Sequence, residues 1–263
     1  MDISIVVPIH NEAENIAGLV AEIHAALDGR HDYEIIYIDD HSTDRSPEVL
    51  KALQASFPRL RSLRHARRSG QSVGLLTGVK AASHPLIVTL DGDGQNDPAD
   101  IEKVLAPFSE GAYEFPALMV IGHRTIRRDT RWRRLSSRAA NSVRRWMLGD
   151  CVPDSGCGIK AFSRELFLSL PFFDHIHRFL PPLVKRAGGG VISVPVHHRP
   201  RRHGQSHYGT LDRLRVGIVD LLGVMWLMHR AGPRMAVRCA ENASASPPIA
   251  GSSPVTTSRP HPT

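Results

Sequence analysis

Short apolar segments alternate with amphipathic helical segments through the first half of this chain, and this order limits the fold more than any other feature of the sequence. Strands that are joined by helices need crossover connections, which place the strands parallel in one sheet. We therefore expect an α/β fold with a mostly parallel central sheet flanked by helices. The expected strands are 3–8, 34–39, 60–64, 86–90 and 117–121, and the expected helices between them are 12–27, 46–55 and 71–82.

The second half of the chain is less regular. Apolar residues recur at spacings of three and four in 131–148, which predicts an amphipathic helix with Trp132 and Trp146 on its apolar stripe. We expect a strand at 188–196, entered through three glycines, and a long, mostly apolar helix at 211–229. The sheet would therefore be followed by two C-terminal helices with an apolar side.

The chain is expected to hold one domain, residues 1–230, followed by a disordered tail at 239–263. The tail is rich in Ser, Pro, Thr and Ala and buries too little apolar surface to become ordered. No stretch reaches the roughly 18 apolar residues of a membrane-spanning helix. The chain begins with the strand-like 3–7 instead of a signal peptide, and three cysteines provide no disulfide framework. These features predict a cytoplasmic protein.

Positive charge is in excess. The net charge is +7 at pH 7 and the isoelectric point is near 9.8. This charge favours an anionic partner, and nucleic acid, acidic lipid and nucleotide phosphates all remain open on this observation alone. The charge is concentrated between Arg124 and Arg145, where nine arginines occur against one acid, Asp129.

An Asp-Gly-Asp-Gly-Gln sequence, Asp91 to Gln95, directly follows the apolar segment 86–90. Such an apolar run is typical of a strand buried on both faces, and open α/β sheets bind ligands just beyond the carboxyl ends of their strands. Asp91, Asp93 and Gln95 offer the oxygen ligands that Mg²⁺ or Mn²⁺ prefers, often together with substrate phosphates. The segment therefore predicts a metal site for a phosphate-bearing substrate. A tight turn without a ligand is the alternative, since Asp and Gly are also common in turns.

Acidic residues also follow the first two expected strands. Glu12 comes after the first strand, and Asp39, Asp40 and Asp44 come after the second. Because the carboxyl ends of parallel strands meet at one edge of a sheet, a single site explains all of these clusters. The alternative for Glu12 and Asp44 is helix capping, because acids are favoured at the N-termini of helices.

Several known site types are absent from the sequence. No G-x-G-x-x-G motif follows the first strand, and G-x-x-x-x-G-K-[ST] does not occur, which argues against dinucleotide dehydrogenases and P-loop NTPases. Fifteen histidines suggest zinc, but neighbours such as His197 and His198 would point to opposite faces of a strand. Nucleic-acid binding is disfavoured, because no helix-turn-helix, zinc-finger or aromatic stacking pattern is found.

The residues at the strand ends resemble the motifs of the family 2 glycosyltransferases, whose GT-A fold is Rossmann-like. The narrower similarity is to the dolichol-phosphate mannosyltransferase and polyprenyl-phosphate glycosyltransferase branch, and it spans roughly residues 3–230. In the first half the matching blocks are Val7-Pro8-x-x-Asn11-Glu12, Ile38-Asp39-Asp40-x-Ser42-x-Asp44 and Leu90-Asp91-x-Asp93-x-Gln95-x-x-Pro98. In the second half they are Gly122-x-Arg124, Ser137-Arg138-x-x-Asn141, Asp154-Ser155-Gly156-Cys157-Gly158, His177-Arg178-Phe179-Leu180-Pro181 and Arg199-x-Arg201-x-x-Gly204-x-Ser206-x-Tyr208-Gly209.

This resemblance implies roles for particular residues. Nucleotide binding is implied for Pro8, Asn11, Glu12, Asp39, Asp40, Asp91 and Gly92. A Mg²⁺ or Mn²⁺ ion would be held by Asp91, Asp93 and Gln95. Contacts with an acceptor phosphate and the loop around it are implied for Arg124, Arg138, Arg201, Arg202 and Ser206. The implied catalytic residues are Asp93, Arg124, Arg138 and Arg201.

The implied reaction is the metal-dependent, inverting transfer of a hexose from a GDP- or UDP-sugar to a polyprenyl phosphate, such as dolichyl or undecaprenyl phosphate. Its product would be a lipid-linked sugar for the synthesis of cell-envelope glycans or glycolipids. An acceptor phosphate is already anionic, so it needs cations to hold it and no general base. Transfer to a hydroxyl group in polysaccharide synthesis is the alternative, and the block from Arg201 to Gly209 argues against it.

A lipid acceptor also implies contact with a membrane. The helix expected at 131–148 combines tryptophans with flanking arginines, which suits an anionic lipid surface. The alternative is a core-packed helix with a solvated basic face. The helix expected at 211–229 could likewise lie on lipid or pack on the sheet. We expect peripheral attachment to the cytoplasmic face of a membrane, directly or through a separate membrane protein.

Overall fold

The computed structural model of the protein describes residues 1–109, 118–124, 147–149, 152–200, 210–230 and 240–241, and of 210–216 and 240–241 it describes the backbone alone. Its centre is one eight-stranded sheet with the strand order β3-β2-β1-β4-β6-β5-β7-β8. The strands are β1 (Asp2–Ile9), β2 (Asp32–Asp39), β3 (Leu60–Arg64), β4 (Leu86–Thr89), β5 (Leu118–Arg124), β6 (Lys160–Ser163), β7 (Gly190–Val196) and β8 (Ala240–Glu241).

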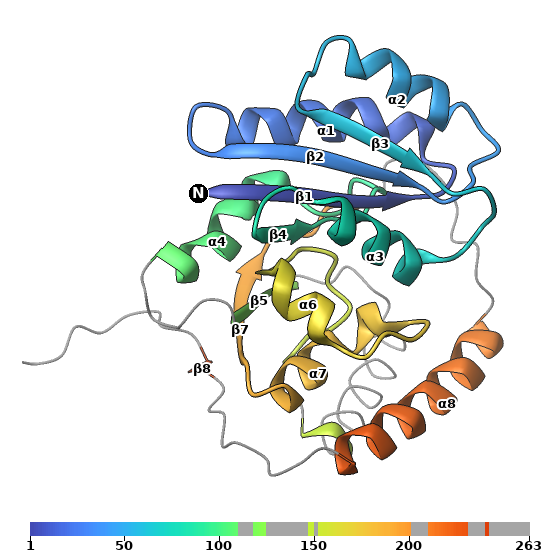
Figure 1. The fold of residues 1–263 in the computed structure, drawn as a ribbon, viewed down its shortest axis with the longest axis vertical. Coiled ribbons are helices and arrows are strands. Elements are labelled where there is room, and N and C mark those ends of the chain that lie inside the picture. The colour runs from blue at the N-terminus through green and yellow to red at the C-terminus, as the bar shows by residue number, and fades with distance from the viewer. Residues whose placement is uncertain (110–117, 125–146, 150–151, 201–209, 231–239, 242–263) are drawn as a thin grey trace, which may run out of the picture.

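Helices cover both faces of this sheet. They are α1 (Ala13–Leu27), α2 (Ser46–Gln54), α3 (Gln71–Ala81), α4 (Ile101–Ser109), α6 (Arg164–Ser169), α7 (Leu180–Arg186) and α8 (Thr210–His229), with short 3₁₀ turns η1 (Pro98–Asp100) and η2 (Ile176–Arg178). Figure 1 shows α3 and α6 in front of the sheet and α1 behind it. The chain moves outward from β1 to β3 through α1 and α2 and returns to β4 through α3, so right-handed crossovers place α3 on the opposite face.

The expected alternation of strands and helices in the first half is confirmed. β1 pairs in parallel with β2 and β4, and β2 pairs in parallel with β3. All four residues of β4 are buried, as expected of a strand covered on both faces. In α1 the buried residues recur at the helical spacing that the sequence shows, and they are Ile16, Leu19, Val20, Ile23 and Leu27, with Asn15 beside them.

The strand β6 is the main departure from the expected sheet. It lies between β4 and β5 and runs antiparallel to both, so the sheet is mostly parallel with one reversed strand. Its four residues, Lys-Ala-Phe-Ser, include no β-branched side chain and begin with a charge, so they show no strand pattern. The pairing depends on long-range packing, and the sequence gives no local sign of it.

Two expectations concern segments that are partly outside the described residues. Of the helix expected at 131–148, only 147–148 are described, and they are helical. In the tail expected to be disordered from 239, Ala240 and Glu241 instead pair with β7 as β8, and 242–263 lie outside the described residues. Strand pairing uses backbone groups, so it does not require the apolar side chains that this segment lacks. Within the described residues, no helix combines the length and apolar character needed to cross a bilayer.

Candidate active site

The acidic clusters of the sequence lie at one edge of the sheet. In the parallel register, Ile9 at the end of β1 pairs with Asp39 at the end of β2, and Val6 pairs with Thr89 at the end of β4. The segments that follow these strands therefore emerge side by side, as expected. They carry Asn11 and Glu12, Asp39 to Asp44, and Asp91 to Gln95.

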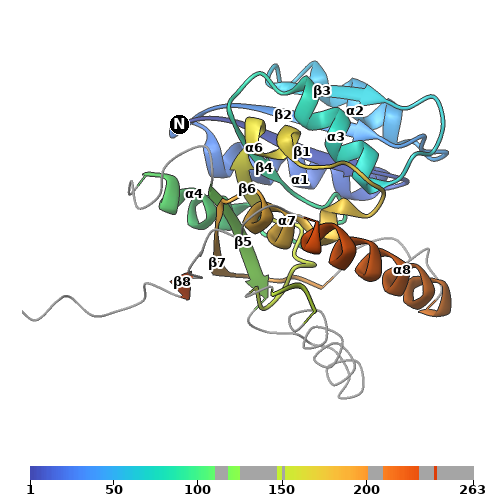
Figure 2. The same ribbon diagram turned by 60° about the horizontal axis from the view of Figure 1, so that its bottom comes forward.

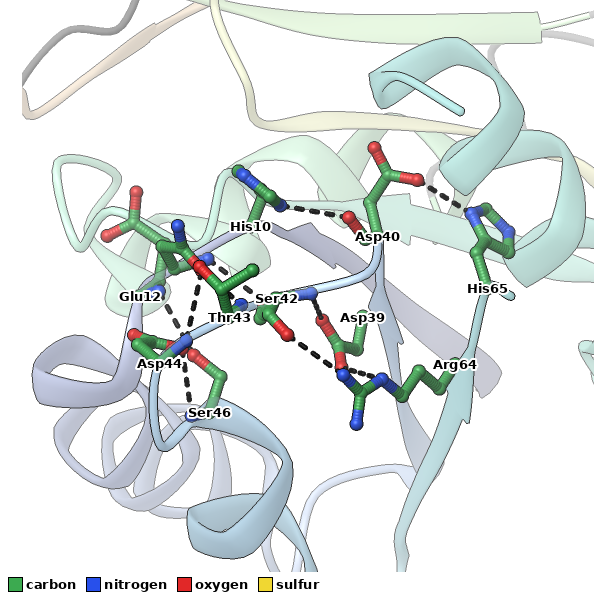
Figure 3. A network of polar contacts seen from close by, with 11 residues as sticks. His10, Glu12, Asp39, Asp40, Ser42, Thr43, Asp44, Ser46, Arg64 and His65 are labelled. Carbon is green, nitrogen blue, oxygen red and sulfur yellow. Dashed lines mark hydrogen bonds and ion pairs between the residues drawn. The ribbon is translucent and has the colours of Figure 1, made fainter. Parts of the chain in front are cut away.

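Hydrogen bonds join the loop after β1 to the loop after β2 (Figure 3). Asn11 has a φ of 57°, which is an unusual backbone conformation for a residue other than glycine. Its Oδ1 accepts from the backbone N of Thr43 at 2.7 Å, and its own backbone N donates to Ser42 Oγ at 2.9 Å. Asn11 thus fixes the loop after β1 against the loop after β2. It is also one of the residues for which nucleotide binding is predicted.

Asp44 caps two helices at once, which confirms the capping alternative for this residue. Its Oδ2 accepts from the backbone N of Ala13, the first residue of α1, at 3.1 Å, and its Oδ1 accepts from the backbone N of Ser46, the first residue of α2, at 2.9 Å. Burial raises the pKa of Asp44, but these hydrogen bonds outweigh burial and lower it overall. The carboxylate therefore stays charged at both helix N-termini.

Asp39 and Asp40 are buried and also hold neighbouring backbone. Asp39 Oδ1 accepts from Ser42 N at 2.8 Å, and Oδ2 lies 3.2 Å from Arg64 Nε without a well-aligned hydrogen bond. Asp40 accepts from the backbone N of Ser69 at 2.7 Å and of Gly70 at 2.8 Å.

The second contact of Asp40 is with a histidine. His65 Nδ1 lies 2.8 Å from Asp40 Oδ1, as Figure 3 shows. Burial raises the pKa of Asp40, but the hydrogen bonds from His65, Ser69 and Gly70 together lower it. Asp40 is therefore a fixed anion that shapes the entrance to α3.

The loop after β4 is closed on itself by its own polar groups. Asp93 Oδ1 accepts from the backbone N of Gln95 at 3.1 Å, and the backbone N of Asp91 donates to Asn96 Oδ1 at 3.3 Å. Gln71, the first residue of α3, donates from Nε2 to Asp91 Oδ1 at 2.9 Å. The three predicted metal ligands Asp91, Asp93 and Gln95 thus lie on one short, internally braced loop.

The electrostatics of this loop suit a divalent cation. Burial raises the pKa of Asp91, and the nearby carboxylate of Asp93 raises it further, while Lys160 and Arg124 oppose this change. Two like charges in a partly buried loop repel one another, and a cation between them would remove that repulsion. Within the described residues, no group of three or more His, Cys, Asp or Glu side chains is arranged as a metal site. Two carboxylates and one amide fit an ion that completes its shell with substrate phosphate.

Arg124 lies at the end of β5 and forms a two-pronged ion pair. Its Nε donates to Asp154 Oδ2 at 2.6 Å, and its NH2 donates to Asp154 Oδ1 at 2.9 Å. Burial lowers the pKa of Arg124, but Asp154 outweighs burial and raises it. Of the five predicted acceptor-side residues only Arg124 is described; the other four, Arg138, Arg201, Arg202 and Ser206, lie outside the described residues.

We expect Arg124→Met to lower the free energy of unfolding by about 3 kcal/mol, because it removes the ion pair and both hydrogen bonds that Arg124 makes with the buried carboxylate of Asp154. The double variant Arg124→Met/Asp154→Asn should recover part of this loss, since it also removes the buried charge. Urea unfolding monitored by circular dichroism measures both. Equal losses in the single and double variants would show that the pair does not hold this part of the site.

Sequence reasoning assigned no role to Gln71 and Lys160, which lie close to Asp91, or to His177, which contacts Ser72 beside Gln71. Gln71 begins α3, and its only local sign is a preceding glycine with a φ of 88°. Lys160 is 6% exposed and donates to the backbone oxygen of Cys157, and burial lowers its pKa although Asp91 opposes the change. His177 Nδ1 lies 2.9 Å from Ser72 Oγ.

His177 is a neutral group in this environment. Burial, together with the cations Lys160 and Arg178 and the neighbouring His175, lowers its pKa to about 3. Its contact with α3 crosses more than one hundred residues of sequence, so no local pattern indicates it.

Comparison with known proteins agrees with this arrangement. The sequence profile "Glycosyl transferase family 2" matches residues 4–170. The dodecaprenyl-phosphate galacturonate synthase of Rhizobium johnstonii is 32% identical over 243 residues, which cover 89% of this chain and 69% of that protein. The undecaprenyl-phosphate 4-deoxy-4-formamido-L-arabinose transferase of Edwardsiella ictaluri is 31% identical over 217 residues, which cover 81% of this chain and 65% of that protein. The chain thus spans about two thirds of the length of these relatives.

Solved structures share the fold. A mannosyltransferase from Pyrobaculum calidifontis, in complex with GDP-mannose and Mn²⁺, superposes with a TM-score of 0.62 at 19% identity, covering 89% of this chain and 65% of that one. The glucosyl-3-phosphoglycerate synthase of Mycobacterium tuberculosis, in complex with Mn²⁺, UDP and phosphoglyceric acid, superposes with a TM-score of 0.64 at 22% identity, covering 88% and 80%. The sequence match and the shared GT-A architecture together establish that this chain belongs to glycosyl transferase family 2.

Proposed function

We propose that this protein transfers a sugar from a nucleotide donor to a polyprenyl phosphate, with the help of a divalent metal ion. The observation that carries the proposal is the similarity, over 81–89% of the chain, to relatives named for dodecaprenyl-phosphate and undecaprenyl-phosphate sugar transfer. The loop after β4, from Asp91 to Asp97, supports it and is called the acidic loop below. It offers oxygen ligands at the edge of the sheet, where a donor diphosphate would bind.

Mg²⁺ or Mn²⁺ would be held by Asp91, Asp93 and Gln95. The ion would supply positive charge to the donor diphosphate, which makes the diphosphate a better leaving group. Gln71 would keep Asp91 in a fixed orientation through its 2.9 Å hydrogen bond. Lys160, buried behind Asp91, would offset part of the negative charge of the loop.

The donor nucleotide would lie along the loops after β1 and β2. Pro8, Glu12 and Gly92 border this edge, and Asp39 and Asp40 stand at the end of β2. Glu12 also accepts from Asn15 Nδ2 at 2.7 Å, so its carboxylate is oriented at the start of α1. Asn11 would contribute to nucleotide binding by holding the loops after β1 and β2 together through its bonds to Ser42 and Thr43.

The acceptor phosphate would be held by cations. Arg124, at the end of β5, is our first candidate for this role, and Arg138, Arg201, Arg202 and Ser206 are further candidates. In the inverting step, an acceptor phosphate oxygen forms the new bond to the anomeric carbon as the bond from that carbon to the donor diphosphate breaks, and the electron pair leaves with the diphosphate. The acceptor carries no proton that must be removed, so the site needs no general base. Asp93, Arg124, Arg138 and Arg201 are our candidates for catalytic residues.

Transfer to a hydroxyl group of a polysaccharide remains the second candidate, and donor binding is the first test common to both. Calorimetric titration of the full chain with UDP and with GDP, each with Mn²⁺ or with EDTA, would show whether a nucleotide binds and which base is preferred. Binding of one nucleotide that is lost in EDTA supports the metal-assisted donor site. Binding of neither nucleotide with Mn²⁺ would contradict both candidates.

Membrane attachment is proposed through α8. Its apolar residues Ile218, Val219, Leu222 and Trp226 are 50%, 69%, 48% and 60% exposed, although they follow helical spacing along one side. Arg230 lies with its guanidinium carbon 5.5 Å from the centre of the Trp226 ring, a pairing suited to an anionic lipid surface. Figure 2 shows α8 along the outside of the molecule, away from the sheet. We propose peripheral attachment on the cytoplasmic face, directly or with a membrane protein partner.

The double variant Val219→Glu/Trp226→Glu is expected to lose most of its binding to vesicles that contain an anionic phospholipid, because it places two charges where apolar groups would enter the interface. Co-sedimentation with vesicles measures this. Leu63→Glu is the control, since Leu63 is 40% exposed on the edge strand β3. Figure 1 shows β3 near the top of the view and α8 at the lower right. Equal loss in both variants, or in neither, would contradict the assignment of this surface to α8.

A further inference from the structure

The segment that follows β7 lies directly against the acidic loop. His198 forms an antiparallel bridge with Asn96, and the backbone N of Arg199 donates to the backbone oxygen of Gln95 at 2.9 Å. Gln95 is thereby held from two sides, because its own backbone N donates to Asp93 Oδ1. The positions of Gln95 and Asn96 thus depend on a piece of chain about one hundred residues further along the sequence.

The side chain of Arg199 fixes this contact. Its NH1 donates to Glu22 Oε2 on α1 at 2.6 Å, and its NH2 lies 2.7 Å from Asp97 Oδ1. The three side chains are 28%, 33% and 18% exposed, so this bridge is partly withdrawn from water. The guanidinium of Arg199 therefore connects Asp97, at the end of the loop, to Glu22 on α1.

A second anchor lies two residues away and holds the same segment. Asp100 is 1% exposed, and its carboxylate accepts from the backbone N of His197 at 2.5 Å and contacts His197 Nδ1 at 3.1 Å and Lys103 Nζ at 2.7 Å. His197 is thus fixed by its backbone, whereas its side chain is largely exposed. Asp100 holds the segment 197–199 beside the loop from Asp91 to Asp97 through its bond to the backbone of His197. Arg199 then bonds to the backbone of Gln95 and fixes its position.

We propose that Arg199 is a positioning residue for the loop from Asp91 to Asp97. By its ion pairs with Asp97 and Glu22 and its bond to the backbone of Gln95, Arg199 holds this loop so that Gln95 can share an ion with Asp91 and Asp93. Asn96 carries the effect to Asp91, because Asn96 Oδ1 accepts from the backbone N of Asp91. This inference rests on the proposed metal-assisted function.

Arginine suits this position better than lysine would. A guanidinium presents separate N–H groups in a rigid plane and can donate to two carboxylates on different elements, whereas an ammonium is a single point of charge. Arg199→Lys should therefore keep one of the two ion pairs, and Arg199→Met should keep neither.

The test is the affinity of the full chain for Mn²⁺ in the presence of UDP or of GDP, measured from the electron paramagnetic resonance signal of free Mn²⁺. Arg199→Met should weaken Mn²⁺ binding by about 10- to 100-fold, as the loss of groups that orient metal ligands commonly does. Arg199→Lys should lie between this variant and the wild type. Arg59→Met is the matched control, because Arg59 forms a 3.1 Å ion pair with Asp32 at the start of β2, and its Mn²⁺ affinity should be unchanged.

A merely structural role would lower the melting temperature of Arg199→Met and leave the Mn²⁺ affinity of the folded protein unchanged, and that result would overturn the proposal. Should Arg199→Met fail to fold, Asp97→Asn tests the same bridge, because asparagine can still accept from the backbone N of Ala99 as Asp97 does at 3.0 Å. Asp97→Asn should weaken Mn²⁺ binding, and unchanged binding would again overturn the proposal. Absence of Mn²⁺ binding in the wild type would instead contradict the proposed function itself.

Discussion

Asp93→Asn should lower the rate of sugar transfer by roughly a thousandfold at saturating donor and Mn²⁺. The carboxylate of Asp93 is one of the two carboxylates among the three proposed metal ligands, and asparagine keeps its size while removing its charge. A metal ion that stabilises a leaving diphosphate contributes several kcal/mol to the transition state, and about 4 kcal/mol corresponds to about three orders of magnitude in rate. Because Asp93 is partly exposed, the folded state should tolerate the change.

Initial rates of transfer and the free energy of unfolding, measured on the same preparations, check this prediction. Asp32→Asn serves as the control, because Asp32 is an exposed acid at the start of β2, at the other end of that strand from Asp39, and forms an ion pair with Arg59. A variant at Asp93 that keeps more than half of the wild-type rate would show that its carboxylate is not a metal ligand. A loss of stability equal to the loss of activity would attribute the effect to folding.

Gly158→Ala should weaken Mn²⁺ binding and lower stability, for a steric reason. A Cβ atom at Gly158 would lie 2.3 Å from Asp91 Oδ2, 2.4 Å from Asp91 Cγ and 2.5 Å from Asn96 Oδ1. Gly158 cannot easily retreat, because its carbonyl oxygen accepts from Thr89 Oγ1 at 2.8 Å in the buried part of the sheet. The added methyl group therefore displaces Asp91, and with it the loop that Asn96 closes.

We expect Gly158→Ala to weaken Mn²⁺ binding by at least about tenfold and to lower the free energy of unfolding by about 1–3 kcal/mol. Gly18→Ala is the matched control: Gly18 lies in α1, a Cβ there meets nothing within 4 Å, and alanine should stabilise the helix by about 0.5–1 kcal/mol. Mn²⁺ titration and urea unfolding measure both quantities. Unchanged Mn²⁺ affinity in folded Gly158→Ala would mean that Asp91 does not need its present position.

The first half of the fold could be predicted from sequence because each of its elements carries a local signal. The apolar spacing of α1 and the apolar run of β4 each determine one element, and crossover handedness then determines which face of the sheet each connecting helix covers. β6 has no such signal. Its four residues become a strand only because β4 and β5 leave a place between them.

The site shows the same division. The edge of the sheet at which Asp91 and Asp93 lie follows from parallel pairing alone. What each acid contacts does not follow from the sequence: Asp44 caps two helices, and Asp40 holds the backbone before α3. Gln71 and Arg199 reach the acidic loop from segments 20 and about 100 residues away, and such contacts depend on tertiary packing.

Comparing transfer to a polyprenyl phosphate with transfer to the corresponding alcohol tests whether the acceptor is a lipid phosphate. The full chain would be incubated in detergent with Mn²⁺ and a radiolabelled nucleotide sugar whose base the binding experiment has selected. Undecaprenyl phosphate and undecaprenol would be offered separately, and each reaction would be repeated in EDTA. We predict label in the lipid fraction with undecaprenyl phosphate and Mn²⁺, and none with undecaprenol or in EDTA. Equal labelling of undecaprenol, or no labelling of the phosphate by a donor that binds, would contradict this prediction.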